Sequence, residues 1–147
     1  MVAFLSLVCY ADIKVFVKGE KRVAKRVVIA GSRTFCDYEV ARCFIDRCIA
    51  GRDGEEIIVL SGCARGADAL GERYAHEHGL TIELYPAQWQ TYGKAAGIRR
   101  NQEMAEACDL VICFWDGGSR GTKSMIALAR KYNKPVFIKE IERLGEQ

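Results

Sequence analysis

Two hydrophobic patterns alternate along most of the chain. Short apolar runs, several of them rich in β-branched residues, recur at 26–30, 57–60, 80–85, 109–115 and 135–139. The β-branched run at 26–30 is typical of a strand that is buried on both faces of a sheet. The pattern therefore predicts five strands.

The segments between these runs carry apolar residues at helical spacing. Val40, Phe44 and Cys48 share one side of the first such segment, and Asp37 before it is a suitable N-cap. Gly79 follows the second segment, at the position where a left-handed helix cap is expected. The expected helices cover 38–49, 66–78, about 98–107 and 121–132, with a polar loop at 88–97 and a frayed helix at 140–147.

This regular alternation of strands and helices predicts the fold class. It indicates an α/β protein with a mostly parallel sheet and right-handed crossovers, which is a Rossmann-like doubly wound fold. With 147 residues, half of them hydrophobic and 28% charged, the chain has the size and composition of a single globular domain. We place this domain at 26–147, after an N-terminal extension at 1–25.

The extension contains an apolar run at residues 2–11. Its length is that of the hydrophobic part of a signal peptide, but no basic segment precedes it, and it is too short to span a bilayer. We expect an extra N-terminal strand or hairpin here, as an edge strand or a subunit contact, followed by a turn at 18–21. No membrane association is expected, and the expected location is the cytoplasm.

The cysteines and histidines do not suggest a metal site. The chain has seven cysteines, an odd number without a C-x-x-C pair, which fits reduced thiols in the cytosol. His76 and His78 are two residues apart on an expected helix, so they point to different faces. We therefore expect neither a metal nor a cofactor.

Glycine-rich turns follow three of the expected strands, at 30–33, 61–68 and 117–125. Glycine lets backbone amides approach a phosphate, and the start of the following helix adds further donors. Ligands of doubly wound sheets bind outside the carboxyl ends of the strands, where all three turns are expected to meet. The sequence therefore predicts a crevice for an anionic ligand.

Basic residues dominate this expected edge, although the net charge of the whole chain is only +3. Guanidinium groups offer paired donors that suit phosphate or carboxylate. The alternative is a solvated basic rim without a ligand. The basic residues are Arg33, Arg65, Lys94, Arg99, Arg100, Arg120 and Lys123, against the acidic Asp68 and Asp116.

Other side chains near this edge have two interpretations each. The hydroxyls of Ser32 and Ser61 would donate to a phosphate or bond their own turns. Asp68 would accept bonds from ribose hydroxyls or a base, or complement a helix dipole. Trp89 and Tyr92 would stack on a base or hold their loop against the core.

Four segments carry the most specific signal: 31–33 (Gly-Ser-Arg), 61–68 (Ser-Gly-Cys-Ala-Arg-Gly-Ala-Asp), 93–101 (Gly-Lys-Ala-Ala-Gly-Ile-Arg-Arg-Asn) and 116–122 (Asp-Gly-Gly-Ser-Arg-Gly-Thr). Together they resemble the YspA-like (YAcAr) branch of the SLOG superfamily. That superfamily joins the DNA-processing protein Smf/DprA with the Lonely Guy cytokinin-activating phosphoribohydrolases. The resemblance covers about residues 26–138, with all motifs in order.

The resemblance implies a Rossmann-like domain that binds nucleotides or nucleotide-derived small molecules, often as a homo-oligomer. It also implies a prophage, conflict or signalling context, in which such domains act as sensors or as enzymes on the ligand. The expected partners are therefore a nucleotide-derived small molecule and further copies of the chain, as a dimer or a larger assembly.

The chain departs from the Lonely Guy enzymes at one informative position. Their Pro-Gly-Gly-x-Gly-Thr-x-x-Glu pattern supplies a glutamate that serves in cleaving the N-glycosidic bond. Here Asp116 replaces the proline, the turn has one more residue, and Met125 stands where the glutamate would be. A methionine cannot handle a proton, which puts the same hydrolysis in doubt. The only candidates for a catalytic role are Asp68, Asp116 and Glu103.

The leading hypothesis is binding, for sensing or sequestering, of a nucleotide or a nucleotide-derived phosphate-containing ligand. The alternative is N-glycosidic hydrolysis of nucleoside monophosphates or NAD-derived nucleotides. Single-stranded DNA binding ranks last, because the basic edge is local and has few aromatic residues. The expected ligand-binding residues are Gly31, Ser32, Arg33, Ser61, Gly62, Arg65, Gly66, Asp68, Lys94, Arg99, Asn101, Asp116, Gly117, Gly118, Ser119, Arg120, Gly121 and Thr122.

Overall fold

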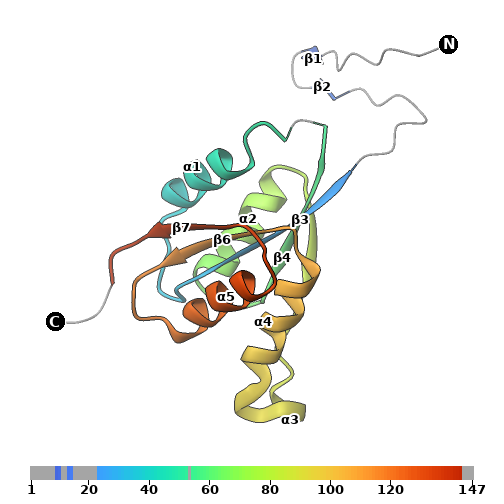
Figure 1. Ribbon diagram of the computed structural model, residues 1–147. Coiled ribbons are helices and arrows are strands. Elements are labelled where there is room, and N and C mark those ends of the chain that lie inside the picture. The colour runs from blue at the N-terminus through green and yellow to red at the C-terminus, as the bar shows by residue number, and fades with distance from the viewer. Residues whose placement is uncertain (1–8, 11–12, 15–22, 53, 144–147) are drawn as a thin grey trace.

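A parallel sheet of five strands forms the centre of the molecule in a computed structural model, which describes residues 9–10, 13–14, 23–52 and 54–143 (Figure 1). The strand order is β5-β4-β3-β6-β7, and all four ladders are parallel. The predicted α/β doubly wound fold is therefore confirmed. The strands are β3 (Ala24–Gly31), β4 (Glu56–Ser61), β5 (Thr81–Leu84), β6 (Leu110–Trp115) and β7 (Val136–Glu140).

The order of the strands reverses between β3 and β6. From β3 the chain adds β4 and β5 on one side, and then returns to place β6 and β7 on the other. Gly31 at the end of β3 is in register with Phe114 near the end of β6. Doubly wound sheets bind their ligands at such a reversal, outside the carboxyl ends of the strands.

Helices cover both faces of the sheet (Figure 1). Helices α1 (Tyr38–Ile49) and α2 (Ala67–Glu77) pack on one face, and α4 (Ala96–Ala107) and α5 (Arg120–Lys131) pack on the other. Side chains alternate along a strand, so Val27 of β3 belongs to the α1/α2 core and Val28 to the α4/α5 core. The sheet thus separates two hydrophobic cores.

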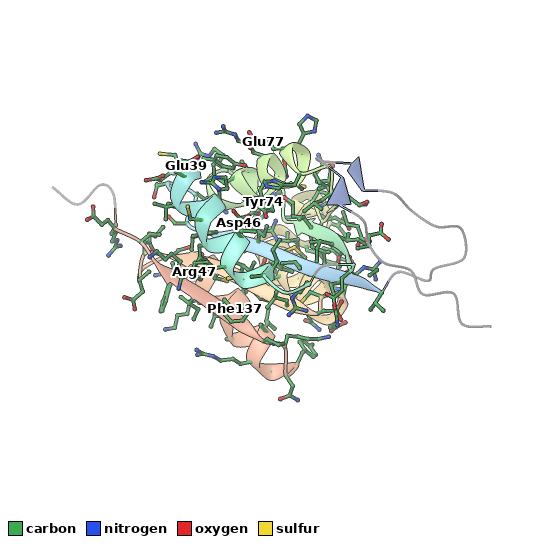
Figure 2. All side chains as sticks on the ribbon, turned by 90° about the horizontal axis from the view of Figure 1, so that it is seen from above. Glu39, Asp46, Arg47, Tyr74, Glu77 and Phe137 are labelled. Atoms are coloured by element: carbon green, nitrogen blue, oxygen red, sulfur yellow. The ribbon has the colours of Figure 1, made fainter. Side chains whose placement is uncertain are left out.

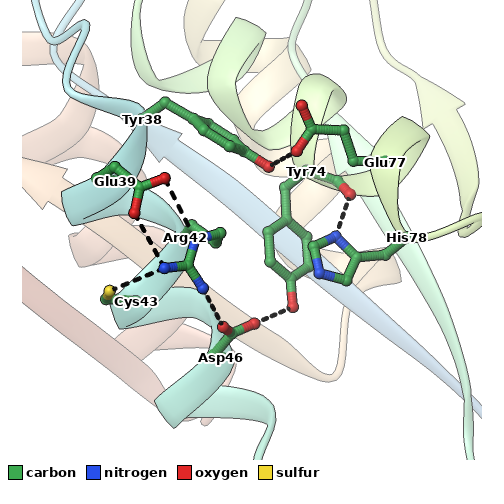
Figure 3. Close-up of polar contacts among 8 residues, drawn as sticks. All are labelled: Tyr38, Glu39, Arg42, Cys43, Asp46, Tyr74, Glu77 and His78. Carbon is green, nitrogen blue, oxygen red and sulfur yellow. Dashed lines mark hydrogen bonds and ion pairs between the residues drawn. The ribbon is translucent and has the colours of Figure 1, made fainter.

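Polar contacts join α1 to α2 at the outer side of the α1/α2 core. The Tyr74 hydroxyl donates to Asp46 at 2.6 Å, and the Tyr38 hydroxyl donates to Glu77 (Figure 3). Burial, with help from Glu77, raises the pKa of Tyr38 to about 12, so this hydroxyl stays a donor at neutral pH. Figure 2 looks onto this layer, with Glu39, Asp46 and Arg47 on α1, Tyr74 and Glu77 on α2, and Phe137 on β7.

Short helical elements occupy most of the segment 88–97, which was expected to be a polar loop. It contains a short helix α3 (Trp89–Tyr92) and a 3-10 turn η1 (Gly93–Ala95), and α4 begins at Ala96, two residues earlier than expected. No residue of α3 is buried, so this helix lacks the apolar spacing that a sequence pattern can detect.

The C-terminal end of the chain differs from the expectation in two ways. β7 continues to Glu140, which pairs with Trp115, and the described residues beyond it are not helical. The rest of the expected helix at 140–147 lies outside the described residues.

Near the N-terminus, β1 (Cys9–Tyr10) and β2 (Ile13–Lys14) form an antiparallel pair, which confirms the expected N-terminal hairpin. These two strands form a sheet of their own and do not extend the five-stranded sheet as an edge. The expected turn at 18–21 lies outside the described residues, so the boundary of the extension stays a prediction. Within the described part of the chain, no helix is long and apolar enough to cross a membrane.

Candidate functional site

A cavity of about 430 Å³ lies at the carboxyl ends of β3 and β6. Its walls come from the turns after these two strands, from α4 and from the first turns of α2 and α5. Its floor includes Ala30, Met104 and Met125, which belong to the α4/α5 core. The volume lies within the range of small-molecule sites, which is roughly 300–1,000 Å³. The cavity thus occupies the place where this topology binds ligands.

The start of α5 presents open hydrogen-bond donors to this cavity. Ser119 caps the helix, because its hydroxyl accepts the Thr122 amide at 3.4 Å. The next two amides, those of Arg120 and Gly121, have no hydrogen-bond partner among the described residues, and both residues line the cavity. Unpaired amides and the positive end of the helix dipole both favour a bound anion.

Asp116 holds the turn that leads into α5. Its carboxylate accepts the amides of Gly118 at 2.9 Å and Ser119 at 2.8 Å, and the Ser32 hydroxyl donates to it at 3.3 Å. The Gly118 amide is the largest influence on the Asp116 pKa and, with the Ser119 amide, lowers it below the ordinary value. The ionised carboxylate therefore organises the turn and is already engaged by the protein.

Arginines give the cavity an excess of positive charge. Arg33 and Arg120 are exposed, and neither forms an ion pair within the described residues. Arg100 is half-buried and fixed in place, since it donates to the Gly62 carbonyl and, through Nε at 3.0 Å, to Asn101. This arrangement suits a phosphate or a carboxylate.

Asp68 is a buried carboxyl group in the cavity wall, with 6% of the residue exposed. Burial raises its pKa, although the Ala64 amide that donates to it at 3.2 Å acts in the opposite direction. A Cβ atom at Gly62 would lie 2.8 Å from both Asp68 and Arg100, so glycine there leaves room for these two side chains. Among the expected catalytic candidates, Asp68 has the environment of a proton donor.

Two of the motif glycines are required by packing between the turns. A Cβ at Gly31 would overlap the Phe114 carbonyl oxygen, and a Cβ at Gly66, where φ is +73°, would overlap the backbone of Ser32. The Ala67 amide donates to the Ser32 carbonyl at 3.1 Å across this close approach. By contrast, a Cβ at Gly121 would meet no atom within 4 Å. The first two glycines therefore bring the turns together.

The structure brings most of the expected ligand-binding residues to one place. Ten of them line the cavity: Gly31, Ser32, Arg33, Asp68, Asn101, Asp116, Ser119, Arg120, Gly121 and Thr122. A second cavity beside it is lined by Arg33 again and by Gly62 and Arg65. The remaining expected residues, which line neither cavity, are Ser61, Gly66, Lys94, Arg99, Gly117 and Gly118, and the catalytic candidate Glu103 is also outside both.

Two of the outlying residues have other partners. The Ser61 hydroxyl donates to Glu72 at 2.6 Å and accepts the Cys63 amide, which is its turn-forming alternative. The Arg99 guanidinium lies 3.9 Å from the centre of the Tyr92 ring. Tyr92 therefore contacts a neighbouring side chain, while Trp89 is 53% exposed.

Sequence reasoning missed some of the lining residues, namely Thr34, Ala64, Arg100, Met104 and Arg143. The sequence places Arg100 in the basic edge, but it predicts ligand binding by the neighbouring Arg99. Helical spacing contains the missing signal, because Arg100 and the buried Met104 are four residues apart and share one face of α4. Arg143 follows β7, and no motif indicates that it approaches the cavity.

Comparison with known proteins identifies the family. Gene 61 protein of Mycobacterium phage D29 is 36% identical over 122 residues, which cover 77% of this chain and 94% of that protein. The family model described as "YspA, cpYpsA-related SLOG family" matches residues 25–92. The chain belongs to this SLOG family. The resemblance found in the sequence motifs is thereby confirmed.

Two solved structures of the DNA-processing protein DprA share the fold of this SLOG protein. DprA from Streptococcus pneumoniae superposes with a TM-score of 0.60 at 20% identity, over 79% of this chain and 50% of that one. DprA from Helicobacter pylori, a protein with a single-stranded DNA binding mode, superposes with a TM-score of 0.57 at 24% identity. This match covers 83% of this chain and 67% of that one. The SLOG chain thus spans half the length of the streptococcal protein.

Proposed function

We propose that the protein binds a nucleotide or a nucleotide-derived ligand, with a phosphate at the start of α5, and that it senses or sequesters this ligand. The observation that carries the proposal is the pair of amides, on Arg120 and Gly121, that have no partner among the described residues and lie at the wall of a cavity that Arg33 also lines. Amides at a helix start and unpaired guanidinium groups together form a phosphate site. We also expect the protein to work as a homo-oligomer.

The proposal favours binding over catalysis for two reasons. Met125, at the position of the glutamate in the Lonely Guy enzymes, is 1% exposed and contributes an apolar side chain to the cavity floor. Asp116 is engaged by the amides of its own turn. Neither side chain is arranged to move a proton.

Two substitutions at one position test the proposal. Arg120→Ala removes the guanidinium, and Arg120→Pro removes both the guanidinium and the amide N–H. Proline is tolerated here, because Arg120 is the first residue of α5 and Ser119 before it is extended (φ −64°, ψ 115°). We expect Arg120→Ala to weaken AMP binding about tenfold and Arg120→Pro about tenfold more, since a hydrogen bond to a charged group contributes about 1.5–3 kcal/mol.

Isothermal titration calorimetry with AMP measures both steps. Arg47→Ala, in an exposed part of α1 outside the cavity, is the matched control and should bind as the wild type does. The melting temperature should stay the same in all three variants. Wild-type affinity in Arg120→Pro would refute the phosphate site.

Single-stranded DNA binding is a second candidate function, favoured by the likeness to DprA. It predicts an affinity that rises with oligonucleotide length and falls steeply with salt, because several phosphates would be neutralised. Fluorescence anisotropy with a labelled oligonucleotide at two salt concentrations tests this. Absence of binding at low salt excludes it.

Hydrolysis is a third candidate, favoured by the buried Asp68 carboxyl at the cavity wall. Water would add across the N-glycosidic bond, giving free base and sugar phosphate, with Asp68 donating a proton to the leaving base. Incubation with nucleoside monophosphates and NAD, followed by chromatography, detects the base. Release of base that Asp68→Asn abolishes would replace the binding proposal by this one.

A further inference from the structure

A second cavity of about 350 Å³ adjoins the first. The two cavities share Arg33, Ala64 and Arg100, which therefore form a common wall. The far side of the second cavity comes from the turn after β4, from the segment after β5 and from Trp89 of α3. Elements distant in sequence thus extend the site beyond the start of α5.

The second cavity has a uniform charge. Among the described residues, its lining includes Arg33, Arg65 and Arg100 and no acidic side chain, whereas the first cavity also contains Asp68 and Asp116. Arg65 is exposed and forms no ion pair with any residue that the structure describes. Arg100 lies near Asp68, which belongs to the first cavity, whereas Arg33 and Arg65 have no ion-pair partner among the described residues. Guanidinium groups gathered in this way favour a polyanionic part of a ligand.

Trp89 gives this cavity an aromatic surface. The residue is 53% exposed, and a Cβ at Gly97 would lie 3.6 Å from its ring, so the indole rests against α4 at that glycine. Tyr92 on the same short helix lies outside the cavity and contacts Arg99. An exposed indole beside arginines is the arrangement that stacks on a nucleobase.

We propose that the second cavity takes the second base-bearing unit of a dinucleotide, that is, of two nucleotide units joined through phosphate. The base of this unit stacks on Trp89, and the linking phosphate lies along the common wall at Arg33 and Arg100, with Arg65 beside it. The inference rests on the proposed function, because the first unit is the nucleotide whose phosphate binds at α5. Each cavity alone has the volume of a small ligand site, so a mononucleotide at α5 leaves the second cavity open.

The test compares three probes by calorimetry: AMP, the phosphodiester-linked pApA and the pyrophosphate-linked NAD. We expect at least one of the two dinucleotides to bind about tenfold more tightly than AMP. The dinucleotide that binds more tightly shows whether the site prefers a phosphodiester or a pyrophosphate linkage. Trp89→Ala should abolish this advantage and leave the affinity for AMP unchanged, and Arg65→Ala should reduce the advantage. Tyr92→Ala is the matched aromatic control and should keep the advantage.

Tryptophan fluorescence reports the stacking directly. The chain has two tryptophans, and Trp115 packs in the α4/α5 core. The preferred dinucleotide should quench the emission of the wild type but not that of Trp89→Phe.

The outcomes separate the two proposals. If AMP binds but neither dinucleotide binds more tightly, or if Trp89→Ala keeps the advantage, the inference fails and the proposed function stands. If neither AMP nor a dinucleotide binds, both fail. A single-stranded oligonucleotide that binds more tightly than both dinucleotides would replace the inference by the DNA-binding candidate.

Discussion

Two carboxyl groups at the same cavity experience opposite environments. Asp68 is buried, and burial raises its pKa. Asp116 accepts two backbone amides, of which that of Gly118 contributes most, and its pKa is lowered. The surroundings therefore shift the pKa of Asp68 upward and that of Asp116 downward. These directions separate a possible proton donor from a residue that holds a turn.

The opposite shifts predict opposite pH effects on stability. The folded-state pKa of Asp116 lies below its ordinary value of 3.8, so its ionised form stabilises the fold above that pH, and the effect is lost as pH falls. Asp116→Asn should therefore lower the melting temperature at neutral pH. As the pH falls into the acid range, the melting temperature of this variant should decrease less than that of the wild type. Melting curves from acid to neutral pH measure this.

Asp68→Asn is the matched comparison. Because the folded-state pKa of Asp68 is raised, its ionisation opposes folding as pH rises above 3.8. The melting temperature of Asp68→Asn should therefore improve relative to the wild type as pH rises toward neutral. If the melting temperatures of the two variants changed with pH in the same way, the opposite pKa shifts assigned to Asp68 and Asp116 would be contradicted.

Residue identity in the sequence predicted many of the cavity residues but not their roles. Ser32 and Asp116 line the cavity, yet they bond each other and their turns. Ser61 faces Glu72 and is absent from the cavity. A hydroxyl or carboxylate in a motif has several partners within reach, and only the folded turn decides between them.

At the scale of elements, two helices carry the same kind of cap with different consequences. Asp37 accepts an amide at the start of α1, and Ser119 does so at the start of α5. Only the cap of α5 borders the cavity. The caps thus offer a test of whether the start of α5 has a role beyond stability.

We expect Asp37→Ala and Ser119→Ala to lower the free energy of unfolding by about 1 kcal/mol each. Only Ser119→Ala should also weaken AMP binding, because an uncapped first turn no longer holds the amides of Arg120 and Gly121 in place. Urea unfolding and calorimetry measure the two effects. Equal AMP affinity in both variants would show that the cap has a structural role alone.

Elements with strong periodicity were predictable, and those without it were not. The three central strands and the four longer helices have buried residues that repeat along the sequence, and the edge strands β5 and β7 add partly buried apolar residues. Helix α3 has no buried residue, and local backbone bonds define it, such as that from the Tyr92 amide to the Gln88 carbonyl at 3.0 Å. Trp89 reaches the second cavity from this element, so sequence periodicity could not indicate that cavity.

At the scale of the whole molecule, the sheet separates two cores that relate differently to the site. The floor of the first cavity belongs to the α4/α5 core, through Met104 and Met125. The α1/α2 core, which includes Ile45, lies on the opposite face of the sheet. Damage to either core should lower stability, but only one of them shapes the cavity.

Met104→Ala and Ile45→Ala should each lower the free energy of unfolding by about 2–5 kcal/mol, since both side chains are 1% exposed. Met104→Ala should also change the affinity for AMP, because it enlarges the cavity floor. Ile45→Ala should bind AMP as the wild type does at a temperature where it is folded. A binding change in Ile45→Ala of similar size would contradict the independence of the two cores.

The topology explains why three turns distant in sequence meet, and this much followed from the alternation of strands and helices. The position of Arg143 could not be predicted from this alternation, because it depends on the path of the chain after the last strand. Its guanidinium lies near Gly118, where a Cβ would come within 2.8 Å of it. Such a contact joins the turn after β6 to the segment after β7, and it leaves no pattern in the sequence.

The difference between the motif glycines limits how this architecture can evolve. Gly31 and Gly66 have no room for any side chain, because the backbone of β6 occupies the space at Gly31 and the backbone of the turn after β3 occupies it at Gly66. Gly121 borders the same cavity and has open space around its Cβ position. A lineage that changes its ligand can therefore add side chains at residue 121 without separating the turns, whereas positions 31 and 66 are closed to such drift.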